Sequence, residues 1–346
     1  GEIVWEWHMW DHMIQDLDST KLNYGIVANK PGKININALG SELPPMTQDQ
    51  IDGMKHIGFM TSNATVDNQG SDITHCNAIA YNADLDQIVI SSPNMGEIFI
   101  IDHSITTEEA KGSAGDLLYR WGNPANYNRG TKEDQKLFGQ HDVKWIPKGY
   151  PGEGNLIVYN NDIPDPQNKL PNIFVAVLQA QSPDPQISIS DVGNYSAVYE
   201  LPTPISDAGY AITSDAAFEP KEPILAYQAP DKYSLYSAFV SGAQRLKNGN
   251  TLVTEGARGR FLEVTSEGET VWEYWNPYMH GYKLPDGTHS QPMGSFIFAQ
   301  FRGTHFTPDF PAFNGKELKA ISPQPEEFVF KMPPPPPPSK ENDSLK

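Results

Sequence analysis

Short runs in which apolar and polar residues alternate recur along most of the chain. The clearest run, GEIVWEW at Gly1–Trp7, has a near copy, GETVWEY, at Gly268–Tyr274. A looser copy, GDLLYRW, spans Gly115–Trp121, and the weakest, EPILAY, spans Glu222–Tyr227. Alternation over six or seven residues is typical of a half-buried β-strand. Each copy therefore predicts one strand of a repeated unit.

A second type of strand precedes these copies, and it begins at His75, at His141 and at Ser241. In each case a turn and then a β-rich run follow, at residues 87–90, 155–159 and 250–253. The third turn contains Asn248-Gly249, which is a strong hairpin signal. Because the order of strand types repeats, the unit consists of four short antiparallel strands.

Units of this size and composition are typical of β-propeller blades, so we expect an all-β fold with four-stranded antiparallel blades. A β-sandwich with accidental internal similarity is the alternative. The propeller domain is expected over residues 1–330, with full blades at about 73–124, 139–230 and 238–277. Partial blades are expected at 1–10 and 295–330, and insertions at 11–70 and 162–222, the first of them helical over 47–56.

The first copy of the repeated run is predicted to be the last strand of a blade. We therefore expect that blades are missing upstream and that this chain alone does not close into a monomeric propeller. An upstream segment or a second polypeptide would then complete it. The tryptophans at the ends of the copies are expected to lie between blades: Trp5, Trp7, Trp121 and Trp272.

Six prolines, Pro333–Pro338, precede a polar tail that ends at Lys346. Residues 331–346 are expected to be a disordered tail with a polyproline II spacer. A plain linker is the simplest interpretation, and a tether or a ligand for a proline-binding groove is the alternative.

Charge and composition exclude several classes of function. The 346 residues include 43 acidic and 25 basic side chains, for a net charge of −18, which argues against nucleic acid or an anionic membrane surface as partner. No apolar run is long enough to span a bilayer, and a single cysteine, Cys76, excludes a disulfide framework. No metal-binding or nucleotide-binding motif is present, so neither a metal nor a cofactor is expected.

Several motifs together resemble the arylsulfate sulfotransferase family of secreted, bacterial β-propellers. They are the opening run with WDH at 10–12, LDQI at 85–88 with IDHS at 101–104, GQHD at 139–142, GNLIVYNN at 154–161, and SGAQRL at 241–246 with NGNTL at 248–252. The resemblance implies a six-bladed propeller in a secreted or periplasmic location. It also implies transfer of a sulfuryl group between phenols through a histidine, without the nucleotide donor PAPS.

Neutral imidazole is a competent nucleophile near neutral pH and needs no metal. By resemblance, His141 is the sulfuryl acceptor, and His75 is an acid or oxyanion partner on the preceding blade. We expect both to face one central channel together with Ser241. The other candidates for binding a small phenolic sulfate are Arg245, Arg302 and His305; three histidines are expected to be structural: His8, His12 and His103.

One position departs from the family pattern. The family has an arginine after the Ser91-Ser92 pair, and here Pro93 follows it. This removes a planar, permanently charged donor. A non-catalytic propeller that serves as a binding or scaffold module is therefore the alternative function.

Overall fold

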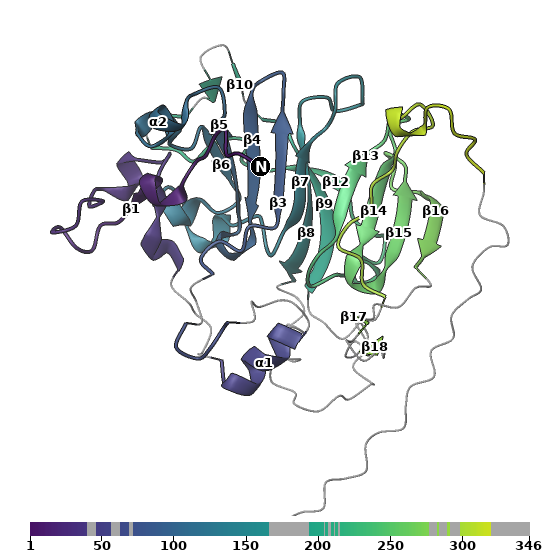
Figure 1. Cartoon of the computed structure of the whole chain (residues 1–346), viewed down its shortest axis with the longest axis horizontal. Helices are drawn as coiled ribbons and strands as arrows, with labels where there is room; N and C mark the ends of the chain where they lie inside the picture. The colour runs from purple at the N-terminus through teal and green to yellow at the C-terminus, as the bar shows by residue number, and fades with distance from the viewer. Residues whose placement is uncertain are drawn as a thin grey trace, which may run out of the picture.

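The structure is a computed structural model, and it is mostly β. It describes residues 1–39, 46–56, 63–68, 72–165, 194–203, 205–206, 209–210, 212–213, 215–276, 282–283, 289–290 and 298–319. Three four-stranded antiparallel sheets stand side by side (Figure 1). The prediction of an all-β chain built from four-stranded antiparallel units is confirmed.

The strands of each sheet follow one another in space. The first sheet contains β3 (Ala78–Asn82), β4 (Gln87–Ser92), β5 (Glu97–Asp102) and β6 (Tyr119–Trp121). The second contains β7 (His141–Trp145), β8 (Leu156–Pro164), β9 (Asn194–Leu201) and β12 (Ile224–Tyr227). The third contains β13 (Gly242–Arg245), β14 (Thr251–Glu255), β15 (Arg260–Val264) and β16 (Thr270–Trp275). Three copies of the repeated run thus form β6, β12 and β16, the last strand of each sheet.

Small elements complete the described part of the chain. The α-helices in the described residues are α1 (Gln48–His56), which lies within the predicted helical stretch, and α2 (Thr107–Ala110). Two-residue strands form three pairs: β1 (Met13–Ile14) with β2 (Ile34–Asn35), β10 (Ile205–Ser206) with β11 (Gly209–Tyr210), and β17 (Tyr282–Lys283) with β18 (His289–Ser290). Neither of the helices described is long and apolar enough to cross a membrane.

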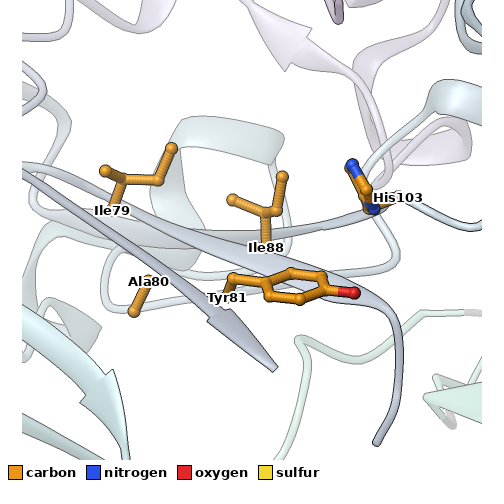
Figure 2. Close-up of a pocket in the computed structure, with 5 residues that line it drawn as sticks. All are labelled: Ile79, Ala80, Tyr81, Ile88 and His103. Carbon is orange, nitrogen blue, oxygen red and sulfur yellow. The ribbon is translucent and has the colours of Figure 1, made fainter. Parts of the chain in front are cut away.

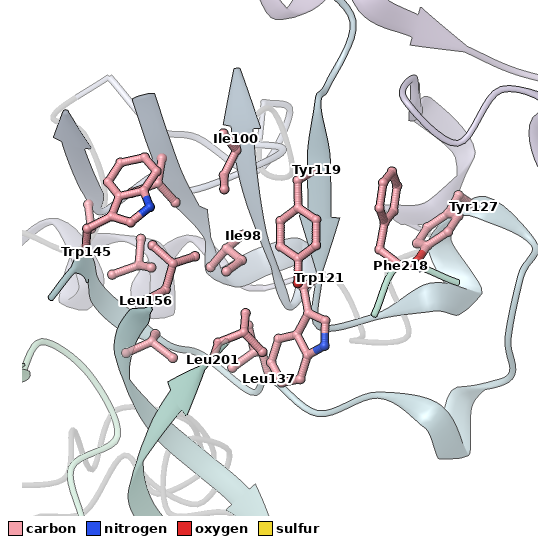
Figure 3. Close-up of a cluster of buried hydrophobic side chains, with 14 of the residues drawn as sticks. Ile98, Ile100, Tyr119, Trp121, Tyr127, Leu137, Trp145, Leu156, Leu201 and Phe218 are labelled. Carbon is pink, nitrogen blue, oxygen red and sulfur yellow. The ribbon is translucent and has the colours of Figure 1, made fainter. Parts of the chain in front are cut away.

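Two apolar cores join the three sheets. The first core lies between the first and second sheets, where Ile98 and Ile100 meet Leu156 and Leu201 (Figure 3). Trp121 is 4% exposed and belongs to this core, as predicted. The second core joins the second and third sheets in the same way. Each fully buried aliphatic side chain contributes about 1.5–3 kcal/mol, so these cores fix the sheets relative to one another.

The strand predicted over Gly1–Trp7 does not form. The indole Nε1 of Trp5 donates to the carbonyl of Ile105 at 2.8 Å, and that of Trp7 donates to the carbonyl of Gly115 at 2.7 Å. The two indoles pack against a third apolar cluster, on the face of the first sheet that points away from the second. Side-chain anchors thus hold this segment, because no neighbouring strand in the described structure pairs with its backbone.

Two other predictions also differ from the structure. The expected insertion at 162–222 contains β9, and five of the eight residues of this strand are buried. Trp272 was expected between blades, but it is 48% exposed because no sheet covers that face of the third sheet in the described structure. The segment 298–319 contains no strand, and the predicted tail at 331–346 lies outside the described residues.

Candidate functional site

The edge strand β7 contacts the edge strands β3 and β13, and the residues where the chain enters these three strands form the candidate site. The chain enters each strand near a residue with a positive φ: 48° at His75, 60° at Asp142 and 87° at Ser241. A left-handed backbone is costly for residues other than glycine, and such residues cluster at functional sites. The left-handed residues at these three strand starts therefore mark the candidate functional site.

His141 is the first residue of β7, and only 7% of it is exposed. Its Nδ1 lies 2.8 Å from the carbonyl oxygen of Gly139 and 2.9 Å from Oδ1 of Asn161. Both atoms are acceptors, so Nδ1 carries the proton and donates. Its Nε2 accepts a hydrogen bond from the backbone N–H of Val240 at 3.1 Å, so Nε2 holds the lone pair. The imidazole is therefore neutral and fixed in one tautomer.

Burial lowers the pKa of His141 to about 4, from an ordinary value of 6.5, because the imidazolium would be poorly solvated. Hydrogen bonds to Asn161 and Gly139 oppose this shift, and the nearby charges of His75 and Arg302 add to it. At neutral pH the ring carries no charge. The same interactions show that His75 and Arg302 lie within electrostatic reach of His141.

His75 forms a dyad with Asp72. Its Nδ1 is hydrogen-bonded to one carboxylate oxygen of Asp72, and its backbone N–H donates to the other at 2.9 Å. The imidazole is 26% exposed. A carboxylate that is hydrogen-bonded to Nδ1 fixes the orientation of the ring and leaves Nε2 as its other polar atom.

The three predicted channel residues do not hold equivalent places in their sheets. His141 is the first residue of its strand, Ser241 lies one residue before Gly242, and His75 lies three residues before Ala78. The correspondence between His75 and His141 is thus wrong residue by residue, although both lie at strand starts. The segments that enter the strands differ in conformation, and β7 carries an additional residue in a β-bulge.

Ser241 is fully buried. Its Oγ accepts from the backbone N–H of Gly256 at 2.9 Å, and its own N–H donates to the carbonyl of Phe301 at 2.8 Å. These bonds fix the turn after β14 and the segment that crosses the third sheet. Pro93 begins a short 3-10 turn directly after Ser92, whose hydroxyl donates to the carbonyl of Thr74 at 3.0 Å.

The remaining candidates separate into two places. Arg302 donates from Nη1 to Oδ1 of Asp142 at 3.0 Å, beside His141. Arg245 is the last residue of β13, at the opposite end from Ser241, and forms an ion pair with Glu200 at 2.6 Å. His305 is exposed, and its backbone is hydrogen-bonded to the side chain of Gln244. The structure thus brings Arg302, but not Arg245 or His305, to the strand starts.

Asn161 is a site residue that the sequence interpretation missed. Asn161 lies in β8 and is fully buried. Its Oδ1 accepts from Nδ1 of His141, and its Nδ2 donates to the carbonyls of Ser237 at 2.8 Å and Val240 at 2.9 Å. The available signal was the pair Asn160-Asn161, which directly continues the apolar run of the strand, since buried amides need specific partners.

A shallow apolar pocket of about 360 Å³ lies on the flank of the first sheet, and Figure 2 shows its lining. The lining residues are Ile79, Ala80, Tyr81, Ile88 and His103. None of them belongs to the group around His141. Within the described ranges, no three His, Cys, Asp or Glu side chains are grouped so that they could hold a metal ion.

Comparison with known proteins gives one family. The family model of the arylsulfotransferases (ASST) matches residues 1–278. No curated protein matches the chain.

Two solved structures are similar to the chain at low identity. A protein of unknown function from Bacteroides caccae is 12% identical, with a TM-score of 0.29 over 61% of this chain and 50% of that one. Selenomethionine-substituted virginiamycin B lyase from Staphylococcus aureus is 10% identical, with a TM-score of 0.26 over 59% of this chain and 56% of that one. The chain thus spans about half the length of these proteins.

Proposed function

Because the chain belongs to the arylsulfotransferase family, we propose that it transfers a sulfuryl group between phenols through His141, without PAPS. The observation that carries the proposal is the state of the His141 imidazole. Its proton is held on Nδ1 by Gly139 and Asn161, and its pKa of about 4 keeps Nε2 unprotonated at neutral pH. Only an imidazole in this state can act as a nucleophile.

In the proposed reaction the Nε2 lone pair attacks the sulfur of an aryl sulfate. The bond between the sulfur and the ester oxygen that carries the aryl ring breaks. The phenolate leaves with the electron pair of that bond and takes up a proton. The imidazole gains positive charge in this step, and the hydrogen bonds from Nδ1–H to its two acceptors stabilise that charge. In the second step the oxygen of another phenol attacks the sulfur while its proton passes to His75, and the bond from nitrogen to sulfur breaks.

Two neighbours support this chemistry. His75, oriented by Asp72, is the proposed proton donor to the leaving phenolate. The guanidinium of Arg302 lies within electrostatic reach of His141 and can stabilise the charge on the sulfuryl oxygens, which is spread in a loose transition state. The single hydrogen bond from Val240 to Nε2 must open for the attack, so substrate binding is proposed to displace that residue.

The exposed flanks of the outer sheets support the proposal that another segment or chain packs there. On the first sheet Ile79 is 69% and Tyr81 is 55% exposed, and on the third sheet Trp272 is 48% and Tyr274 is 37% exposed. Apolar patches of this kind mark interaction sites in soluble proteins. A secreted or periplasmic location remains part of the proposal.

The direct test is incubation with 4-nitrophenyl sulfate and phenol, with release of nitrophenolate as the readout. Release by the wild type and by His103→Ala, but not by His141→Ala, is expected, because His103 lies on the flank of the first sheet. Absence of release from a folded wild-type protein would contradict the proposal. The protein would then be a non-catalytic binding or scaffold module.

A further inference from the structure

A buried carboxylate next to His141 holds two cations together. Asp142 has 1% of its side chain exposed; its Oδ2 lies 2.7 Å from Nζ of Lys144, and its Oδ1 accepts from Nη1 of Arg302 at 3.0 Å. Lys144 belongs to β7, whereas Arg302 belongs to the segment that crosses the third sheet. One carboxylate against two cations leaves a local charge of +1 in a protein with a net charge of −18.

The backbone around Asp142 is built for this arrangement. Its φ is 60°, and it lies in the β-bulge between His141 and Lys144, which redirects the side chain toward the third sheet. There it packs on Gly242, where an added Cβ would lie 2.1 Å from the carboxylate Oδ2. A left-handed residue, a bulge and a facing glycine thus combine to place one carboxylate.

Arg302 is fixed on both sides by its neighbours. The carbonyl of Phe301 accepts from Ser241 at 2.8 Å, and the N–H of Gly303 donates to Oγ1 of Thr254 at 3.0 Å. The side chain of Arg302 is 41% exposed and that of Lys144 is 25% exposed. Within the described part of the chain, Nε and Nη2 of Arg302 donate no hydrogen bond. The cations therefore have donors left for a ligand, and the carboxylate does not face solvent.

We propose that Lys144 and Arg302 bind the oxygens of an anionic group and that Asp142 is the residue that positions them. If the proposed function holds, on which this assignment of the ligand rests, the group is the sulfate ester of the donor. A guanidinium presents two parallel donors to an oxyanion, and an ammonium adds a point charge at a second oxygen. The separation of the two cations by Asp142 sets the geometry that the anion must match.

Benzenesulfonate is a suitable probe, because it carries the aromatic ring and three sulfur-bound oxygens but no transferable ester. Its affinity is measured by calorimetry for the wild type, Lys144→Met, Arg302→Met and, as control, the exposed Lys148→Met. Loss of one charged hydrogen-bond donor is expected to weaken binding about tenfold or more in the first two variants, and not in the control. No binding by the wild type, or equal binding by all four proteins, would overturn the proposal.

Asp142→Asn separates positioning from simple electrostatics. If the carboxylate only opposes the anion, its removal tightens binding, and this result would overturn the positioning role. If it positions the cations, binding weakens, and the preference for benzenesulfonate over the planar benzoate falls as well. Melting curves of each variant confirm that the protein compared is folded.

His141→Ala distinguishes this proposal from the proposed function. The probe needs no nucleophile, so the variant should bind it as the wild type does. If the wild type lacks transferase activity but binds the probe in a way that depends on Lys144 and Arg302, the anion site stands and the proposed function is refuted. Transferase activity with binding that ignores both cations would keep the function and refute the anion site.

Discussion

Replacing Asn161 by alanine tests the hydrogen-bond network that fixes His141. The amide makes three hydrogen bonds from a fully buried position, one to Nδ1 of His141 and two to the carbonyls of Ser237 and Val240. A buried hydrogen bond contributes about 0.5–1.5 kcal/mol, so the substitution should cost about 2–4 kcal/mol of unfolding free energy. Urea denaturation at pH 7 measures this loss.

The neighbouring Asn160→Ala is the matched control. Asn160 is also fully buried, but it is hydrogen-bonded to the backbone of Lys136 and Phe138 and not to His141. Both variants should lose stability, whereas only Asn161→Ala should change the NMR signals of His141. Its pKa should fall further, because the bond to Asn161 raises it. A loss below about 1 kcal/mol in Asn161→Ala would refute the network as described.

Three further outcomes are expected. Glu97→Gln removes the carboxylate that pairs with Arg120, where both side chains are 0% exposed, and should lower the free energy of unfolding measured in urea by about 3–5 kcal/mol. Glu108→Gln, at an exposed ion pair, should change that free energy little. Burial holds the pKa of His141 near 4 in the folded protein, so between about pH 6.5 and pH 4 only the unfolded chain binds a proton at this residue. The free energy of unfolding should therefore be highest above this window and fall by up to about 3 kcal/mol as the pH drops through it. The fall should be smaller in His141→Ala. Trp272→Ser should leave the melting temperature unchanged and reduce any self-association in light scattering, because this indole is 48% exposed.

The sheets could be predicted because their signals are local. Alternation of apolar and polar residues specifies a strand without reference to the rest of the chain, and three copies of one run became β6, β12 and β16. The first copy, Gly1–Trp7, has the same alternation and is not a strand. Strand pairing depends on a partner, and the sequence of one segment does not show whether a partner is present.

The site was less predictable, because its geometry depends on contacts between sheets. His141 was found by resemblance, but its tautomer depends on Asn161 from β8 and Val240 from the segment before β13. The pairing of Lys144 with Arg302 through Asp142 joins residues about 160 positions apart in sequence. No periodicity relates such residues, so only the packed fold reveals them.

The central claim is that Nε2 of His141 accepts a sulfuryl group, and trapping that intermediate tests it most directly. The protein is mixed with 4-nitrophenyl sulfate without an acceptor phenol, quenched, digested and examined by mass spectrometry. The account predicts that the peptide containing His141 gains the mass of one SO₃ group, that added phenol removes it, and that His141→Ala shows no gain. An unmodified His141 peptide in a folded protein, or a gain that persists in His141→Ala, would contradict it.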